Sequence, residues 1–202
     1  AIAEVVKNHP LCVLVTRKKN GGKGKALADG VRKADELGLT HVLQIDSDGQ
    51  HDAERVAHFV EVSKKNPEAI ICAYPEYDES APKHRVNGRT IANAWIHTVT
   101  LSKQIKDGMI GFRIYPVAPY VKLLNSHAII DARMGYDIDI LVRLFWKNVP
   151  VICESVKVTY PVDGVSNFRL VRDNARISLT YARLFLGMIV RLPILIYRKI
   201  KG

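Results

Sequence analysis

The sequence predicts an α/β protein with a Rossmann-type, mostly parallel β-sheet flanked by helices. Short apolar runs alternate with segments whose apolar residues recur at helical spacing, and the links between them are short. With 202 residues, of which 48% are apolar and 25% are charged, the chain can bury one sizeable core. Because such sheets bind ligands at the carboxyl ends of their strands, the residues that follow predicted strands are the first candidates for a site.

The first half of the chain alternates strands and helices. One amphipathic helix is expected to end near Gly38, and Asp52 is placed to cap the N-terminus of the next helix. In chain order we expect the end of a helix at 2–8, strands at 11–16, 41–45 and 69–74, a helix at 25–37 and a helix that follows Asp52.

The second half is less regular, and its last segment is basic and apolar. We expect that segment to be helical with a break at Pro193. In chain order we expect a helix at 86–103, a glycine-kinked strand at 107–115, helices at 116–125 and 136–147, a strand or hairpin at 149–160 and a helix at 167–201. This division predicts a domain at 1–165 and a C-terminal amphipathic segment at 166–202.

Two carboxylates follow the predicted strand at 41–45, in the stretch HVLQIDSDGQH. A divalent cation bound to a diphosphate needs only one or two protein carboxylates, so Asp46 and Asp48 are candidate ligands, and Gln50 can add a carbonyl oxygen. A solvated polar turn is the alternative. A calcium-binding EF-hand loop is excluded, because its sixth and twelfth positions would be His51 and Ala57 instead of glycine and glutamate.

A basic, glycine-containing loop, NGGKGKAL, opens the predicted helix at 25–37. It lacks the spacing of a P-loop, but Lys23 and Gly24 can present positive charge and a backbone N–H group to a phosphate. A solvated basic loop would have the same sequence. Since this loop and the paired carboxylates both follow predicted strands, we expect them to face one crevice.

The haloacid dehalogenase-like phosphatases offer a second interpretation of the aspartate pair. They also place Asp-x-Asp-Gly after an apolar strand, with the first Asp as nucleophile and the second as acid. They normally continue with threonine, where this chain has Gln50, and they place the motif on their first strand. This interpretation is therefore kept as a minor alternative.

An ordered set of segments resembles the family 2 glycosyltransferases of the GT-A fold over roughly residues 11–170. The set comprises NGGKGKALADGVRKADELGLTHVLQIDSDGQH, then DGMIGFRIYP, then MGYDIDILVRLFWKNVPVICESVKVTYP. Within this family, the sequence most resembles the branch that contains the dolichol- and polyprenol-phosphate sugar synthases and the envelope-glycan enzymes.

The resemblance implies an inverting, metal-dependent hexosyl transfer from a nucleotide-sugar donor. The acceptor would be a lipid-linked polyprenyl phosphate or another cell-envelope glycan. By position, Asp46 and Asp48 would bind the donor and Mg²⁺ or Mn²⁺, with Gln50 as a further ligand, and Lys23 and Gly24 would lie on the donor side.

The resemblance also implies an acid in the helix at 136–147. Asp137 or Asp139 would act as the base or orient the acceptor, although Asp137 can equally be a helix cap. Asp107 and Arg113 flank the kinked strand and would face the acceptor.

Two segments of the family pattern are absent. The family begins with a strand bearing V-x-P-x-Y/F-N and continues with a strand ending in D-D-x-S-x-D, and both contribute to the nucleoside site. We therefore expect weak or no activity from these 202 residues alone, as a fragment or as one part of an assembly. The non-enzymatic alternative is an inactive GT-A-like module that binds a nucleotide-sugar or a partner.

The formal net charge of +10 favours anionic partners. No zinc spacing or RNA-binding aromatic run points to nucleic acid, so no nucleic-acid partner is expected. In the C-terminal segment, Ile177, Tyr181, Leu184 and Met188 share a helical face among basic residues. Such a helix can lie on an anionic membrane surface or pack on its own domain. We expect a cytoplasmic protein, peripheral at the inner face of the cell membrane.

Two further expectations come from composition. Cys12, Cys72 and Cys153 are scattered among apolar residues, so we expect reduced, buried thiols. No uncharged apolar run reaches about 18 residues, and Arg191 interrupts the longest one, so we expect no simple transmembrane span.

Overall fold

A computed structural model describes residues 4, 6, 8–46, 51–77, 83–158 and 170–201. Most of the predicted elements form within a few residues of their expected positions. The elements are α2 (Lys23–Glu36), β1 (His41–Gln44), α3 (Arg55–Lys65), β2 (Ile70–Tyr77), α4 (Lys83–Thr100), β3 (Arg113–Pro116), α5 (Val117–Leu124), α6 (Tyr136–Trp146), β4 (Val151–Val158) and α7 (Leu170–Lys201).

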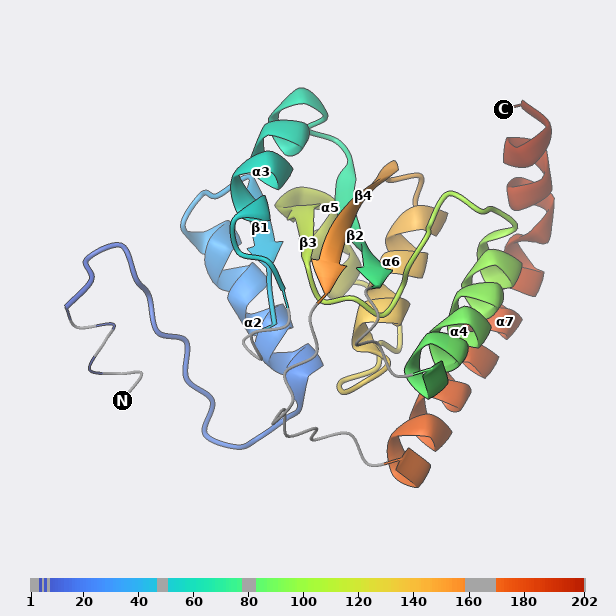
Figure 1. Ribbon diagram of the computed structural model, residues 1–202, viewed down its shortest axis with the longest axis horizontal. Coiled ribbons are helices and arrows are strands. Elements are labelled where there is room, and N and C mark those ends of the chain that lie inside the picture. Colours follow the sequence, from blue (N-terminus) through green and yellow to red (C-terminus); the bar gives the residue numbers. More distant parts are fainter. Residues whose placement is uncertain are drawn as a thin grey trace.

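The described strands form one sheet in the order β1-β3-β2-β4. Strand β3 pairs antiparallel with both β1 and β2, whereas β2 and β4 are parallel, in register from Ile70↔Val151 to Tyr77↔Val158. Three of the four strands therefore run in one direction, and β3 is inserted between them in the opposite direction (Figure 1). The prediction of an α/β fold with a mostly parallel sheet is confirmed in this mixed form.

Helices cover both faces of the sheet. The larger core cluster joins one face, with Ile70 and Tyr115, to α2, α4, α5, α6 and α7. On the other face, Phe59 of α3 stacks on Phe112 with ring centroids 4.5 Å apart. The carboxyl ends of β1, β2 and β4 lie at the same edge of the sheet (Figure 1).

The predicted strand at 11–16 does not form. Leu11 is 97% exposed, Val13 is 55% exposed, and the N-terminal segment runs away from the sheet (Figure 1). An apolar, β-branched run becomes a strand only when another strand pairs with it. Residues 11–16 pair with none of the described strands, and the outer edge of β1 is left without a neighbour among them. The expectation that all three cysteines are buried also fails here, since Cys12 is exposed while Cys72 is buried.

Two other elements differ from their predicted form. Residues 107–112 do not extend β3, because the Asp107 carboxylate accepts the N–H groups of Met109 and Ile110 and bends the chain into a turn. The predicted break at Pro193 is also absent, because α7 is one helix of 32 residues that contains this proline. Met188 before the proline and Leu195 after it are both buried in the same core cluster, which keeps both parts of the helix packed on the domain.

Helix α7 packs on the domain and leaves its outer side uncovered. All four residues that the sequence placed on one face, Ile177, Tyr181, Leu184 and Met188, are buried. The opposite side is apolar and exposed, with Leu186 64% and Val190 80% accessible. In contrast to the expectation from the sequence, the residues 171–201 are long and apolar enough to cross a membrane by length and composition alone.

Candidate functional site

The ammonium group of Lys23 lies between two carboxylates at the carboxyl edge of the sheet. Its Nζ is 2.7 Å from Asp46 Oδ1 and 2.9 Å from Asp137 Oδ2. Lys23 opens α2, Asp46 follows β1, and Asp137 lies in the first turn of α6. Three segments far apart in the sequence therefore converge on one partly exposed charge cluster.

Glycines allow the start of α2 to approach α6 closely. Gly22 has φ +89°, a conformation that suits glycine, and its N–H donates to Asn20 Oδ1. The N–H of Gly24 donates to the Ala132 carbonyl at 3.0 Å, and a Cβ at Gly24 would overlap the Tyr136 ring. The predicted donor-side residue Gly24 is thus used to fix the loop before α6 against α2, which brings Lys23 within reach of Asp137.

Asp46 is confined by its neighbours. A Cβ at Gly111 would overlap the Asp46 carboxylate, so the chain before β3 passes directly beside this side chain. His51 Nε2 lies 4.0 Å from Asp46 Oδ2. His51 Nδ1 is buried, and no residue in the described part of the chain forms a hydrogen bond with it.

Asp137 is held by the two strands beneath it. Gln44 Nε2 donates to Asp137 Oδ1 at 2.7 Å, and Arg113 Nη1 donates to the Asp137 backbone carbonyl at 2.8 Å. Arg113 is fully buried and also contacts the Tyr115 hydroxyl at 3.0 Å. The Asp137 side chain does not cap α6, because its oxygens are directed to Gln44 and Lys23.

The charge cluster keeps Asp46 and Lys23 ionised. Burial by itself would raise the pKa of Asp46, but His51 and the Lys23 ammonium outweigh it, and the pKa falls to about 2. Burial opposes the charge on Lys23 as well, yet Asp137 and Asp46 together raise the pKa of Lys23 above its ordinary value. At neutral pH the site therefore presents a charged carboxylate beside a charged ammonium.

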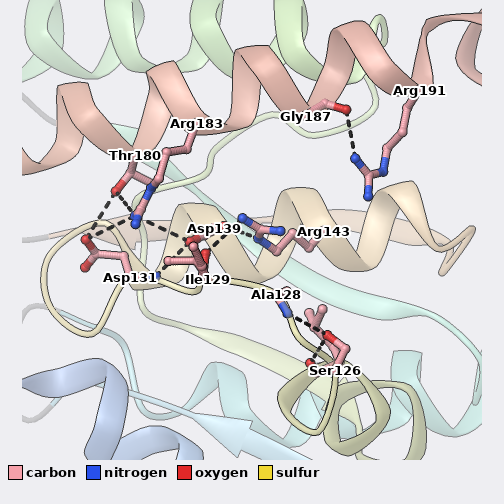
Figure 2. A network of polar contacts seen from close by, with 11 residues as sticks. Ser126, Ala128, Ile129, Asp131, Asp139, Arg143, Thr180, Arg183, Gly187 and Arg191 are labelled. Carbon is pink, nitrogen blue, oxygen red and sulfur yellow. Dashed lines mark hydrogen bonds and ion pairs between the residues drawn. The ribbon is translucent and has the colours of Figure 1, made fainter.

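Asp139, the other candidate acid in α6, faces away from this cluster. It is fully buried, pairs with Arg143, and accepts the Asp131 N–H at 2.8 Å; Arg183 of α7 lies 3.9 Å away (Figure 2). Burial raises its pKa in spite of the adjacent Arg143. Residues two apart on a helix point to nearly opposite sides, so one helix directs Asp137 to the sheet edge and Asp139 to α7.

The two acceptor-side candidates also lie below the surface. Asp107 is 1% exposed, and besides holding its own turn it accepts a hydrogen bond from Asn93 Nδ2 at 3.3 Å and pairs with Arg89 at 3.4 Å. Arg113 lies beneath Asp137, as described above. The structure thus brings Lys23, Asp46 and Asp137 together and separates Asp107 and Asp139 from them.

Sequence reasoning missed three residues that shape the site: Gln44, His51 and Gly111. Gln44 had a signal, since it is a polar residue in an otherwise apolar strand. His51 lies within the quoted DSDGQH motif. Gly111 had only the general signal that a glycine near a strand can mark a close approach of another group.

The described residues partly fit a divalent cation. They contain no group of three or more histidine, cysteine or acidic side chains placed for a metal. The candidate ligands Asp48 and Gln50 lie outside the described residues. Asp46 remains a suitable ligand, because it is ionised above a pH of about 2, and Mg²⁺ held together with a diphosphate requires as little as one carboxylate.

Comparison with known proteins gives one family and several related structures. A sequence profile described as Glycosyl transferase family 2 matches residues 1–127. No curated protein sequence matches the chain.

The solved structures with a similar fold include glucosyl-3-phosphoglycerate synthase from Mycobacterium tuberculosis. Its complex with phosphoglyceric acid gives a TM-score of 0.58 at 15% identity, over 85% of this chain and 56% of that chain. Its complex with Mn²⁺, uridine-diphosphate-glucose and glycerol 3-phosphate gives 0.56 at 14% identity over the same shares. This likeness supports the GT-A fold, and the chain spans little more than half the length of these structures.

Substituting Gly111 by alanine should disturb Asp46 specifically. Its Cβ would overlap the carboxylate, so we expect the free energy of unfolding to fall by about 1–3 kcal/mol, as for other overpacked sites. The matched control is Gly30→Ala in α2, where a Cβ meets nothing within 4 Å, and stability should not fall. Urea unfolding measures both, and equal stability of Gly111→Ala and the wild type would contradict the close approach.

The depressed pKa of Asp46 predicts a pH-dependent contribution to stability. Above about pH 4, the ordinary pKa of an aspartate carboxyl, the free energy of unfolding of the wild type should exceed that of Asp46→Asn by its full amount. Because the folded-state pKa is lowered to about 2, the gain should disappear as the pH falls through that value. Denaturant unfolding of both proteins from pH 7 to pH 2 measures the difference, and a constant difference would show that Asp46 is not paired.

Proposed function

The chain belongs to glycosyl transferase family 2, and on this premise we propose that it serves the transfer of a sugar from a nucleotide-sugar donor to an acceptor, with inversion at the anomeric carbon. The observation that carries the proposal is the convergence of Lys23, Asp46 and Asp137 at the carboxyl edge of the sheet. This is the edge where open α/β sheets bind their ligands.

The donor we propose is a nucleoside-diphosphate sugar. The related mycobacterial structure contains uridine-diphosphate-glucose with Mn²⁺, which supports this class of donor for the present chain. Asp46, together with Asp48 and Gln50, would hold Mg²⁺ or Mn²⁺. When bound, the cation neutralises the charge that develops on the leaving diphosphate.

Lys23 has a defined part in this scheme. Without donor, its ammonium balances Asp46 and Asp137. A diphosphate brings new negative charge and a cation that competes for Asp46, so Lys23 can turn toward the phosphate oxygens while Asp46 turns to the cation. The exchange gives Asp46 and Lys23 new partners of opposite charge, while Asp137 keeps the hydrogen bond from Gln44 Nε2 and becomes free to accept one from an acceptor hydroxyl.

We assign the acceptor-orienting role to Asp137 and not to Asp139. Gln44 and Arg113 fix Asp137 beside Lys23, whereas Asp139 is buried among arginines and faces α7. Asp137 can accept a hydrogen bond or the proton from an acceptor hydroxyl. A phosphate acceptor would need no such base, because it is already anionic.

The acceptor and the place of action that we propose are suggested by α7. We propose a lipid-linked acceptor such as a polyprenyl phosphate, or another envelope glycan, reached at the inner face of the cell membrane. The uncovered apolar side of α7 supports a position in the membrane interface. One side of α7, from Ile177 to Leu195, is buried against the domain. This favours a helix that lies on the membrane over one that crosses it.

A donor-binding module without turnover is the second candidate. In this candidate the cluster of Lys23, Asp46 and Asp137 binds a nucleotide-sugar but no sugar is transferred. The antiparallel strand β3 and the family membership favour both candidates over a haloacid dehalogenase-like phosphatase.

Calorimetry with uridine-diphosphate-glucose and a panel of other nucleotide-sugars tests the proposal. We expect binding that requires Mn²⁺ or Mg²⁺ and weakens at least tenfold in Asp46→Asn, because the cation loses an anionic ligand. Asp35→Asn, an exposed change on α2, should leave binding unaltered. Cation-independent binding, or no binding by any nucleotide-sugar, would contradict the proposal, and sugar transfer at normal rates would remove the non-enzymatic candidate.

A further inference from the structure

An open cavity of about 880 Å³ lies at the end of the domain opposite to Asp46. It is bounded by the ends of α4, α6 and α7, beside Pro150, which precedes β4. Since β1 and β4 run in the same direction, this is the amino-terminal edge of the sheet, whereas Asp46 follows the carboxyl end of β1. The volume is within the range of about 300–1,000 Å³ that is typical of ligand pockets.

The cavity walls combine apolar side chains with positive charge. Leu101, Phe145 and Ile194 contribute apolar surface, while Arg198, Lys199 and Lys201 bring cations from the last turns of α7. None of the described lining residues is an aspartate or a glutamate. Apolar walls with cations and no acids suit a molecule that has a hydrocarbon part and an anionic group.

The cations differ in what they already do. Arg198 donates to the Trp146 carbonyl at 3.1 Å and so satisfies the end of α6. Lys199 and Lys201 are exposed, and within the described part of the chain no carboxylate forms an ion pair with either of them. These two lysines are therefore available to an anionic ligand.

Two helix ends that close with left-handed residues form part of the same walls. In the described residues, Leu101 with φ +51° and Asn148 with φ +67° are the non-glycine residues with positive φ, and both line the cavity. Asparagine tolerates this region, but leucine pays a steric cost there. Both follow the end of a helix, and the N–H of Val149, after Asn148, donates to the Leu144 carbonyl and closes α6.

The cavity opens onto the uncovered side of α7. Ile194, which is 48% exposed, lines it, and the exposed stripe continues from Tyr197 and Ile200 to Val190 and Leu186. Figure 1 shows α7 at one side of the molecule, with its C-terminus at the end far from the carboxyl edge of the sheet. A membrane in contact with this stripe would therefore also reach the mouth of the cavity.

We propose that the cavity seats the headgroup of an anionic phospholipid of the membrane on which α7 lies. The phosphate would contact Lys199 and Lys201, and the acyl chains would run along the apolar stripe. Basic side chains at an anionic surface and a helix with one apolar side are the two components of interfacial binding. The proposal rests on the proposed membrane association and adds the lipid class and the place where its headgroup binds.

The direct test uses dihexanoyl-phosphatidylglycerol below its micelle concentration, titrated into the full chain by calorimetry. We expect binding that falls about 25-fold in Lys199→Gln/Lys201→Gln, since each basic side chain near an anionic lipid contributes about fivefold. The control Lys65→Gln/Lys122→Gln removes the same charge from exposed positions on α3 and α5 and should change binding less than twofold. Ile194→Trp keeps both lysines but places a bulky ring in the cavity beside them, and should weaken binding at least tenfold.

Three results would overturn the proposal. The first is that Ile194→Trp binds dihexanoyl-phosphatidylglycerol as tightly as the wild type does. The second is that dihexanoyl-phosphatidylcholine binds as tightly as dihexanoyl-phosphatidylglycerol. The third is that glycerol 3-phosphate binds as tightly, which would indicate a site for free phosphate. Flotation with vesicles separates this failure from failure of membrane association itself. Leu186→Gln/Val190→Gln should abolish flotation, whereas Leu37→Gln/Leu39→Gln, which are similarly exposed but lie beyond α2, should not.

If the wild type and Lys199→Gln/Lys201→Gln both float equally with neutral and anionic vesicles, the result supports membrane association and contradicts the headgroup site. If the wild type binds neither kind of vesicle and does not bind the short-chain lipid, both fall.

Discussion

The Lys23 ammonium shared by Asp46 and Asp137 is the interaction on which the site depends. It joins the start of α2, the end of β1 and the first turn of α6 through two contacts of less than 3 Å. The other features of the site serve this convergence. Glycines remove the side chains that would separate the segments, and Gln44 and Arg113 hold Asp137 from the sheet below. In the proposed exchange, a diphosphate and its cation become the new partners of Lys23 and Asp46, and Gln44 continues to hold Asp137.

Helix α6 connects this site to the C-terminal helix. Its first turn directs Asp137 to Lys23 at the sheet edge and Asp139 to Arg143 and Arg183, so one short segment carries two buried acids that face different neighbours. Asp139 fixes α7 in position alongside α6. One side of α7 packs on the domain, and its opposite, exposed side is also apolar. The helix that pairs with Asp139 therefore also presents the surface proposed for the membrane.

Local sequence patterns predicted the elements whose cause is local. The helical spacing of Leu27, Val31 and Ala34 located α2, and the apolar run before Asp46 located β1 with its candidate ligand. The failures arose where tertiary contacts decide. Residues 11–16 have the composition of a strand, but none of the described strands pairs with them. The packing of Leu195 carries α7 through Pro193. The position of Gly111 beside Asp46 depends on neighbours that no single segment reveals, and so does the choice of Asp137 over Asp139 as the acid that faces Lys23.

The exchange of Lys23 between carboxylates and phosphate is the central claim, and Mn²⁺ affinity in Lys23→Met tests it most directly. Removing the ammonium frees Asp46 for the cation, so Mn²⁺ alone should bind more tightly than in the wild type. The nucleotide-sugar measured with saturating Mn²⁺ should bind more weakly, because a positive partner of the diphosphate is lost. Opposite changes in the two affinities support the exchange, whereas two unchanged affinities, or a loss of both, would contradict it.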